Sequence, residues 1–163
     1  MAMGDRFYRK ARAKVEERTG EPVEVIGWAS RPGAMGAVIA GQVLRGADVA
    51  SGNPIGLGTS MPRGRMAAAG GGKGTRLPLN FLVALTPNGV HLFGVRNGWT
   101  GVKLKKELGL LPRDGLRLSM KDGGITKQFH LEAGDGSAVG FEMTRCKFTT
   151  TFAADLSAAI PPV

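Results

Sequence analysis

The sequence predicts a mainly β fold of the α+β class, with one antiparallel sheet of seven strands and a C-terminal capping helix. Apolar and polar residues alternate with a period of two over residues 115–144, which is typical of antiparallel strands with one wet face. Glycine-rich turns separate these segments, and glycine supplies the backbone freedom that tight turns need. Near the C-terminus, apolar residues recur four apart, which indicates an amphipathic helix.

A basic amphipathic helix is expected within residues 1–22. Phe7, Ala11 and Val15 recur four apart on one face, and Gly20 follows the last turn as a stop signal. Such a helix can lie on an anionic membrane or on nucleic acid, or it can dock its narrow apolar stripe onto the rest of the protein. The cations that would contact an anionic surface are Arg6, Arg9, Lys10 and Lys14.

The remaining residues, 23–163, are expected to form a single domain that begins with a short strand at 23–28. A long glycine-rich insert follows at 29–80. Residues 46–76 of this insert carry cations among many glycines and are expected to be a flexible arm. The start of the insert has small residues four apart, which on a helix form a smooth ridge where the sheet or a second copy of the chain can pack closely. This predicted self-association ridge consists of Gly33, Ala37 and Gly41.

Three strands are expected between residues 81 and 104. The continuous apolar run at 81–85 indicates a buried strand, and the turn signal Thr86-Pro87-Asn88-Gly89 separates it from the returning strand. A second tight turn is predicted at 97–98, where Asn is followed by Gly. A proline-containing loop is expected at 108–114, before the next strand.

The second half of the sheet and the last helix follow from the same patterns. In three predicted strands, at 116–120, 129–133 and 139–143, apolar residues that face the core alternate with residues that face the solvent. The C-terminal helix buries Phe148, Phe152, Leu156 and Ile160. Hydroxyl groups at 149–151 are expected to cap its N-terminus.

These elements, in this order, resemble the pleckstrin-homology-like (PH-like) fold, a partly open barrel plugged at one end by its last helix. The segment from Phe81 to Phe93 also looks like a strand–Thr–turn–strand segment common in bacterial PH-like domains, many of them actinobacterial proteins of unassigned function. The resemblance implies a seven-stranded PH-like barrel. Phosphoinositide-binding members cluster cations around the loop between their first two strands. The corresponding insert here scatters its cations among glycines and does not form that motif.

No catalytic motif is apparent, and the sequence predicts neither an enzyme nor a metal or cofactor site. His91 and His130 fall on separate predicted strands without the clustered ligands that zinc requires. Cys146 has cationic neighbours that can lower a thiol pKa, but no base stands near it in sequence, so a structural role is favoured. The glycine-rich segment at 70–75 departs from the phosphate-loop pattern at two positions.

Charge carries the strongest functional signal. Lys and Arg total 22 against 13 Asp and Glu, which gives a net charge of +9 and favours anionic partners. If the central strands are neighbours, cations at outward positions form one basic face, although interspersed acids leave open the alternative of an ordinary solvated surface. The predicted basic face consists of Arg96, Lys103, Lys105, Arg117, Lys121 and Lys127.

The sequence therefore predicts a non-catalytic binding or scaffolding module that engages an acidic protein surface or the headgroups of an anionic membrane. A single cysteine and a charged N-terminus favour the cytoplasm, with peripheral association at the inner membrane face. Non-specific binding of nucleic acid is one alternative. A structural subunit of a larger homo-oligomeric assembly is the other.

Overall fold

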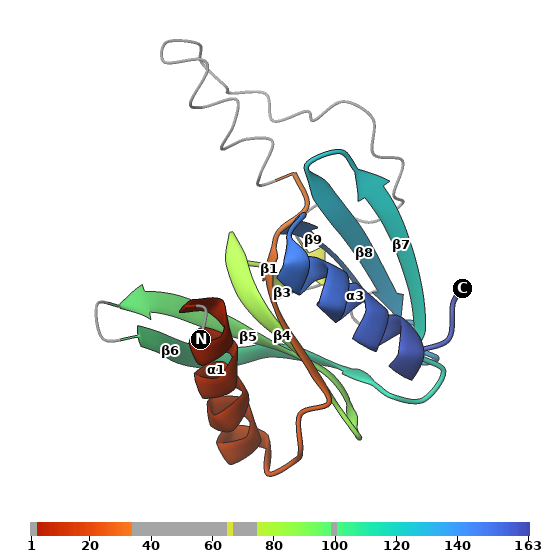
Figure 1. Cartoon of the computed structure of the whole chain (residues 1–163). Helices are drawn as coiled ribbons and strands as arrows, with labels where there is room; N and C mark the ends of the chain where they lie inside the picture. Colours follow the sequence, from red (N-terminus) through yellow and green to blue (C-terminus); the bar gives the residue numbers. More distant parts are fainter. Residues whose placement is uncertain (1–2, 34–64, 67–74, 99–100) are drawn as a thin grey trace.

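The structure is a computed structural model that describes residues 3–33, 65–66, 75–98 and 101–163 (Figure 1). The described helices are α1 (Met3–Thr19) and α3 (Lys147–Ala159). The main sheet contains β1 (Val25–Ser30), β4 (Asn80–Thr86), β5 (Gly89–Gly98), β6 (Gly101–Pro112), β7 (Arg117–Gly123), β8 (Thr126–Glu132) and β9 (Ala138–Thr144). A separate antiparallel pair consists of β2 (Arg65–Met66) and β3 (Thr75–Arg76).

The seven strands are ordered β6-β5-β4-β1-β9-β8-β7, and every pair is antiparallel. The predicted mainly β class, the strand count and the C-terminal helix are thus confirmed. The sheet is not closed into a barrel, because β6 and β7 end it on opposite sides and do not pair with each other. The two halves of the sheet are joined at its centre by a single register pair, Ser30 of β1 with Glu142 of β9.

The main core lies between the two halves of the sheet and α3. Buried residues from all seven strands of the main sheet belong to this core together with the apolar face of α3, and Leu111 is the buried residue that β6 contributes. Three phenylalanines dominate the centre: the ring of Phe129 stacks on Phe141 at 5.0 Å between centroids and meets Phe152 edge-on at 5.4 Å. Offset and edge-on contacts of this kind add stability beyond the area buried. Of the four residues predicted on the buried face of this helix, Phe152 and Leu156 are buried within it and Ile160 is buried just after its end, whereas Phe148 is only partly buried.

Helix α1 docks onto the opposite face of β4 and β5. Ala11 and Val15 are fully buried, and the Phe7 ring meets the Trp28 ring of β1 at 5.3 Å. Gly20 ends the helix with a φ of 72°, and its N–H donates to the Glu16 carbonyl at 2.8 Å. The docking alternative is therefore confirmed, and the apolar stripe of α1 is covered by the chain's own sheet. None of the described helices is long and apolar enough to cross a membrane.

The β5–β6 hairpin is longer than the sequence predicts. A loop was expected at 108–114, but β6 continues to Pro112, which pairs with Gly89. Proline is tolerated there because it is the last residue of an edge strand. The chain also reverses later than expected, since Gly98 pairs with Gly101 and the predicted turn residues lie within β5.

Two residues depart from the predicted alternation. Met120 was expected to face the core but is 39% exposed, because β7 is an edge strand with no neighbouring strand on its outer side. Glu142 was expected on the wet face but is only 3% exposed. It pairs with Ser30 where β1 and β9 meet, so neighbouring strands cover it at the centre of the sheet.

The cap of α3 also differs from the prediction. The N-cap residue is Cys146, which makes no side-chain cap hydrogen bond. The three threonines are the third to fifth residues of the helix, where Thr149 donates to the Thr144 carbonyl while Thr150 and Thr151 donate to carbonyls four residues earlier. Hydroxyl groups inside a helix commonly bond back in this way rather than cap it.

The insert can be compared with expectation at only a few positions. Gly33 has a φ of 79° in the turn after β1, so a helical ridge does not begin there. Ala37 and Gly41, the other members of the predicted self-association ridge, lie outside the described residues. The expected flexible arm includes the β2–β3 pair, in which Arg65 pairs with Arg76.

Candidate functional site

The structure gathers predicted cations at the β6 end of the sheet. Arg96 of β5 and Lys103 of β6 are register partners, so their side chains leave the same face of the sheet. Lys14 and Arg18 of α1 join Lys103 in lining an open groove of about 490 Å³. Members of two sets that the sequence treated separately, the helix and the sheet face, therefore lie side by side.

A row of cations lies along one face of helix α1 and ends at this groove. Arg6, Lys10, Lys14 and Arg18 are each four residues apart, and residues at this spacing share one face of a helix. Arg9 is exposed on the same helix but outside this row. The row ends at the edge of the sheet, where the Arg18 guanidinium donates a hydrogen bond to the backbone carbonyl of Lys105.

That hydrogen bond coincides with an irregularity in β6. Phe93 pairs with Glu107 and Val95 pairs with Leu104, so two residues of β6 lie opposite one residue of β5. The extra residue makes a β-bulge at Lys105 and Lys106. Gly94 lies opposite the bulge, and a Cβ there would come 3.2 Å from the Lys105 Cβ. A residue without a side chain in β5 thus lets Lys105 lie close to the sheet, and Arg18 satisfies its carbonyl.

A second groove, of about 460 Å³, lies beside the bulge. Its cations come from the end of β1 and from the bulge: Arg31, Lys105 and Lys106. Apolar side chains from the segment before β4 and from β5 and β6 line the rest of it: Leu77, Pro78, Leu79, Val95 and Leu108. We call the cations of both grooves, together with Arg96 as the register partner of Lys103, the β6 basic surface: Lys14, Arg18, Arg31, Arg96, Lys103, Lys105 and Lys106.

Acidic partners are scarce at this surface. Within the part of the chain that the structure describes, no carboxylate lies within ion-pair distance of Arg31, Arg96, Lys103, Lys105 or Lys106. Glu17 lines the first groove without pairing to Lys103. The Glu107 carboxylate, although it belongs to β6, is held by His91 at 2.5 Å.

The other half of the predicted basic face lies at the far end of the sheet. Arg117 and Lys121 are on β7 and Lys127 is on β8, and these strands are separated from β5 and β6 by three others. Lys127 pairs with Asp122 at 3.3 Å. Arg117 stands opposite Glu132 in the β7–β8 register. The six cations therefore do not form one patch, and at this end acidic residues are interspersed with the cations.

Sequence reasoning missed three members of the β6 basic surface: Arg18, Arg31 and Lys106. Only Arg18 left a signal in the sequence, because it extends the four-residue spacing of Arg6, Lys10 and Lys14. Arg31 and Lys106 come together through the pairing of β1 with β4 and of β5 with β6. No local pattern reports such long-range neighbours.

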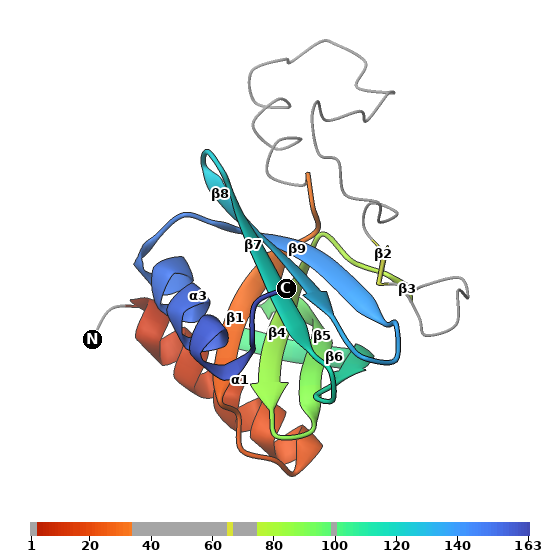
Figure 2. The ribbon, with the colours of Figure 1, turned by 90° about the vertical axis from the view of Figure 1, so that its right-hand side faces the viewer.

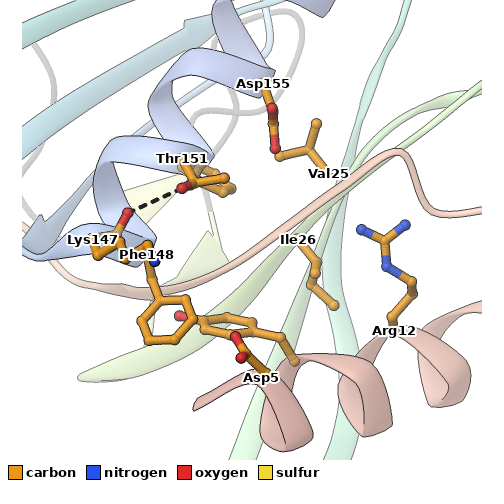
Figure 3. Close-up of a pocket in the computed structure, with 10 residues that line it drawn as sticks. Asp5, Arg12, Val25, Ile26, Lys147, Phe148, Thr151 and Asp155 are labelled. Carbon is orange, nitrogen blue, oxygen red and sulfur yellow. Dashed lines mark hydrogen bonds between the residues drawn. The ribbon is translucent and has the colours of Figure 1, made fainter. Parts of the chain in front are cut away.

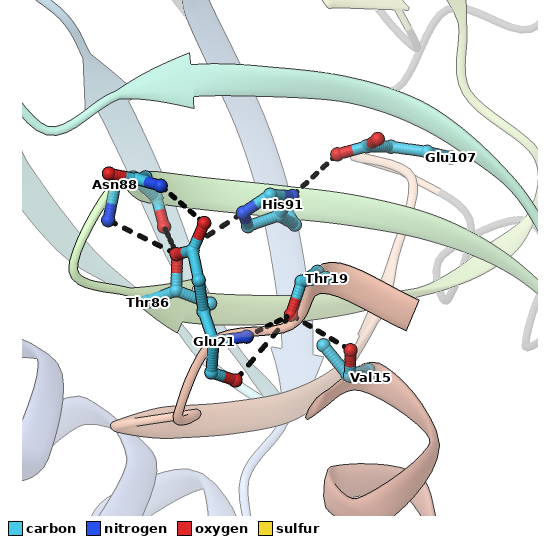
Figure 4. Close-up of polar contacts among 8 residues, drawn as sticks. Val15, Thr19, Glu21, Thr86, Asn88, His91 and Glu107 are labelled. Atoms are coloured by element: carbon cyan, nitrogen blue, oxygen red, sulfur yellow. Dashed lines mark hydrogen bonds and ion pairs between the residues drawn. The ribbon is translucent and has the colours of Figure 1, made fainter. Parts of the chain in front are cut away.

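A polar network around His91 is the second cluster of interest (Figure 4). Its Nδ1 lies 2.5 Å from Glu107 Oε1, and its Nε2 lies 3.2 Å from Thr86 Oγ1. The order hydroxyl, imidazole, carboxylate resembles a catalytic triad. Thr86 is fully buried, however, and its hydroxyl donates to the Gly89 carbonyl at 3.3 Å. A substrate has no access to that oxygen, so the arrangement serves structure.

The same network joins the end of α1 to the β4–β5 turn. The Glu21 carboxylate accepts hydrogen bonds from the backbone N–H of Asn88, at 3.3 Å, and from its side-chain amide. The pKa of Glu21 is lowered, first by its interaction with the Thr86 side chain, and also by Asn88 and the nearby His91, against a raising effect of desolvation. This network fixes the entry from α1 into β1.

A third hollow, of about 420 Å³, is lined by residues of α1, β1 and α3 (Figure 3). Figure 2 shows these two helices next to each other. The rings of Tyr8 and Phe148 close one end of the hollow, with centroids 5.3 Å apart. Burial raises the pKa of the Tyr8 hydroxyl, opposed by a hydrogen bond with the Trp28 backbone. The charged residues around it are of both signs: Asp5, Arg12, Lys147 and Asp155.

Neither metal chemistry nor relatedness assigns a function to these features. Among the described residues, no three His, Cys, Asp or Glu side chains gather in a group that could hold a metal ion. No protein-family model, curated protein or solved structure matches the chain.

Proposed function

We propose that the protein is a non-catalytic binding module with a PH-like fold that holds an acidic protein partner against the β6 basic surface. One observation carries the proposal. At the β6 end, no carboxylate in the described part of the chain lies within ion-pair distance of Arg31, Arg96, Lys103, Lys105 or Lys106, whereas at the β7–β8 end Lys127 is paired with Asp122. The PH-like assignment is supported by the strand order, with β1 between two three-stranded halves, and by α3 against the core.

Clustered like charges repel one another, so a surface of this kind is relieved by an anionic partner. A simpler role for lysines on an edge strand is to discourage pairing with other sheets. That role accounts for Lys103, Lys105 and Lys106 on β6. It does not account for the cations that α1 and the end of β1 add to the same surface, Lys14 and Arg31 among them.

A protein partner is favoured over a membrane by the docking of α1. An amphipathic helix binds a bilayer by burying its apolar face at the headgroup boundary. The apolar face of α1 is already buried, with Ala11 and Val15 at 0% exposure. The helix therefore offers only its charges, which suit a surface of carboxylates. Anionic headgroups and nucleic acid are the competing ligands that the test must separate.

The test is fluorescence anisotropy with labelled polyglutamate as the probe. Lys103→Gln/Lys105→Gln is the site variant, and Arg117→Gln/Lys121→Gln is its matched control with the same loss of charge. If each exposed pair contributes about 0.5 kcal/mol, the site variant binds roughly 5-fold more weakly. We expect the control to bind within about 2-fold of the wild type, which allows for the loss of long-range attraction.

Equal weakening in both double variants would mean that net charge alone drives binding, and would overturn the proposal. Competition distinguishes the ligand classes. Vesicles of anionic phospholipid or duplex DNA that bind more tightly than polyglutamate at physiological salt would replace the acidic protein with lipid or nucleic acid.

A further inference from the structure

The groove beside the β6 bulge combines cations with an apolar floor. Leu79 is 47% exposed, which is high for a large apolar side chain, and it lies with Leu77 and Leu108 along the groove. Lys105 and Lys106 are exposed beside them. Plain electrostatic binding of an anion needs cations only, so the apolar lining calls for its own explanation.

The walls of this groove are held by backbone contacts. The Arg31 N–H donates to the Leu79 carbonyl at 3.0 Å, which ties the end of β1 to the segment before β4. On the other side, the register shift opposite Gly94 and the hydrogen bond from Arg18 to the Lys105 carbonyl hold the bulge. The groove is therefore formed before any ligand arrives, which limits the ordering cost of binding.

We propose that this groove receives an apolar side chain of the acidic partner, from a segment in which that side chain is flanked by carboxylates. The inference rests on the proposed function and specifies its partner. Apolar area buried on Leu79 contributes affinity, and the flanking carboxylates lie against Arg31, Lys105 and Lys106. The volume of about 460 Å³ falls within the usual range of ligand sites.

A peptide segment fits this groove better than a lipid chain. Leu79, Lys105 and Lys106 are all exposed, so the groove is open along its side and does not enclose a long acyl chain. A single side chain with charged neighbours matches the mixture of apolar and cationic lining residues. The complementary charges also set the register of the segment on the surface.

The experiment compares two fluorescein-labelled peptides of equal charge, Glu-Glu-Leu-Glu-Glu and Glu-Glu-Ser-Glu-Glu, by anisotropy. The site variant is Leu79→Ser. The matched control is Ile125→Ser at the β7–β8 turn, where Ile125 is 53% exposed. Because partial burial of one leucine side chain is expected in an open groove, the wild type should bind the leucine peptide about 5-fold more tightly than the serine peptide.

Leu79→Ser should remove this preference and leave the affinity for the serine peptide unchanged, while Ile125→Ser should keep the preference. Equal binding of both peptides by the wild type, still weakened by Lys103→Gln/Lys105→Gln, would overturn the groove proposal and leave the basic surface standing. A leucine preference that survives in Leu79→Ser would overturn it as well. Failure of both peptides and of polyglutamate to bind would overturn both proposals.

Discussion

Gly27 of β1 lies directly against the ring of Phe152 in α3, so that a Cβ atom at residue 27 would lie 2.6 Å from two ring carbons. Real Cβ atoms do not approach ring carbons so closely, so any larger residue must displace the ring or the helix. The C-terminal helix therefore packs directly against the backbone of β1 at Gly27, which has no side chain. This contact places α3 against the core, beside the hollow that it shares with α1.

Gly27→Ala should lower the free energy of unfolding by about 1–3 kcal/mol, because overpacking of a well-filled core forces side chains and backbone to shift. Urea unfolding followed by circular dichroism measures the change. Gly140→Ala is the matched control, since the nearest atoms to a Cβ there are 3.9 Å away. Equal stability of the two variants would contradict the close seating of α3 on β1.

Val15→Ala should lower the free energy of unfolding by roughly 2 kcal/mol, the scale of a buried large-to-small substitution. Val15 is fully buried between α1 and the sheet, whereas Val163 is 69% exposed. Val163→Ala is therefore the control, with an expected change of less than about 0.5 kcal/mol. If Val15→Ala proved as harmless as Val163→Ala, α1 would not be docked in solution and its apolar face would again be available to a membrane.

The strands and helices were predictable because their signals are local. The alternation at Val139, Phe141 and Met143 and the four-residue spacing of Phe152 and Leu156 identified buried faces that the structure confirms. Alternation reports which way a side chain points from its strand but says nothing about the order of strands in the sheet.

The sequence predicted the basic face only in part, because alternation gives the direction of its side chains but not the order of the strands that carry them. Lys105 and Arg117 belong to successive strands along the chain, yet those strands are the two ends of the sheet. Pairing through β1 separates them, and no periodicity encodes that pairing. Arg31 joins Lys105 in one groove through strand pairing alone. The acids that neutralise the far end, such as Asp122, were visible in the sequence, but their selective pairing there was not.

Glu21 should make stability depend on pH in the acidic range. Its pKa in the folded protein lies below the ordinary value of 4.5, chiefly through its interaction with Thr86. The stabilisation from this carboxylate is therefore complete above pH 4.5 and is lost as pH falls through the folded pKa. The stability difference between wild type and Glu21→Gln should be largest near neutral pH and shrink as the pH falls.

Urea unfolding at several pH values measures this difference. Glu17→Gln, on the exposed side of α1, is the control and should show no comparable trend. A constant difference between wild type and Glu21→Gln across the acidic range would contradict the hydrogen bonding of Glu21 to the β4–β5 turn.

The Cys146 thiol should react with iodoacetamide with a midpoint below pH 9. Partial burial acts to raise its pKa, but the hydrogen bond between the thiol and the Thr149 hydroxyl, together with hydrogen bonds from the backbone of Thr149 and Phe148, lowers the pKa from the ordinary 9.0. Thr149→Val, which removes the hydroxyl, should move the midpoint upward, and Thr149→Ser should restore it. A midpoint that is the same in all three proteins would show that the hydroxyl does not stabilise the thiolate.

The central claim is that the β6 end of the sheet, and not the β7–β8 end, binds carboxylates. The most direct measurement is a titration of the ¹⁵N-labelled protein with polyglutamate, followed by the amide chemical shifts at physiological salt. We expect saturable shifts concentrated at Lys14, Arg18, Arg31 and residues 103–106, with the amides of 117–127 unchanged. Shifts spread evenly over both ends, or centred on 117–127, would contradict it.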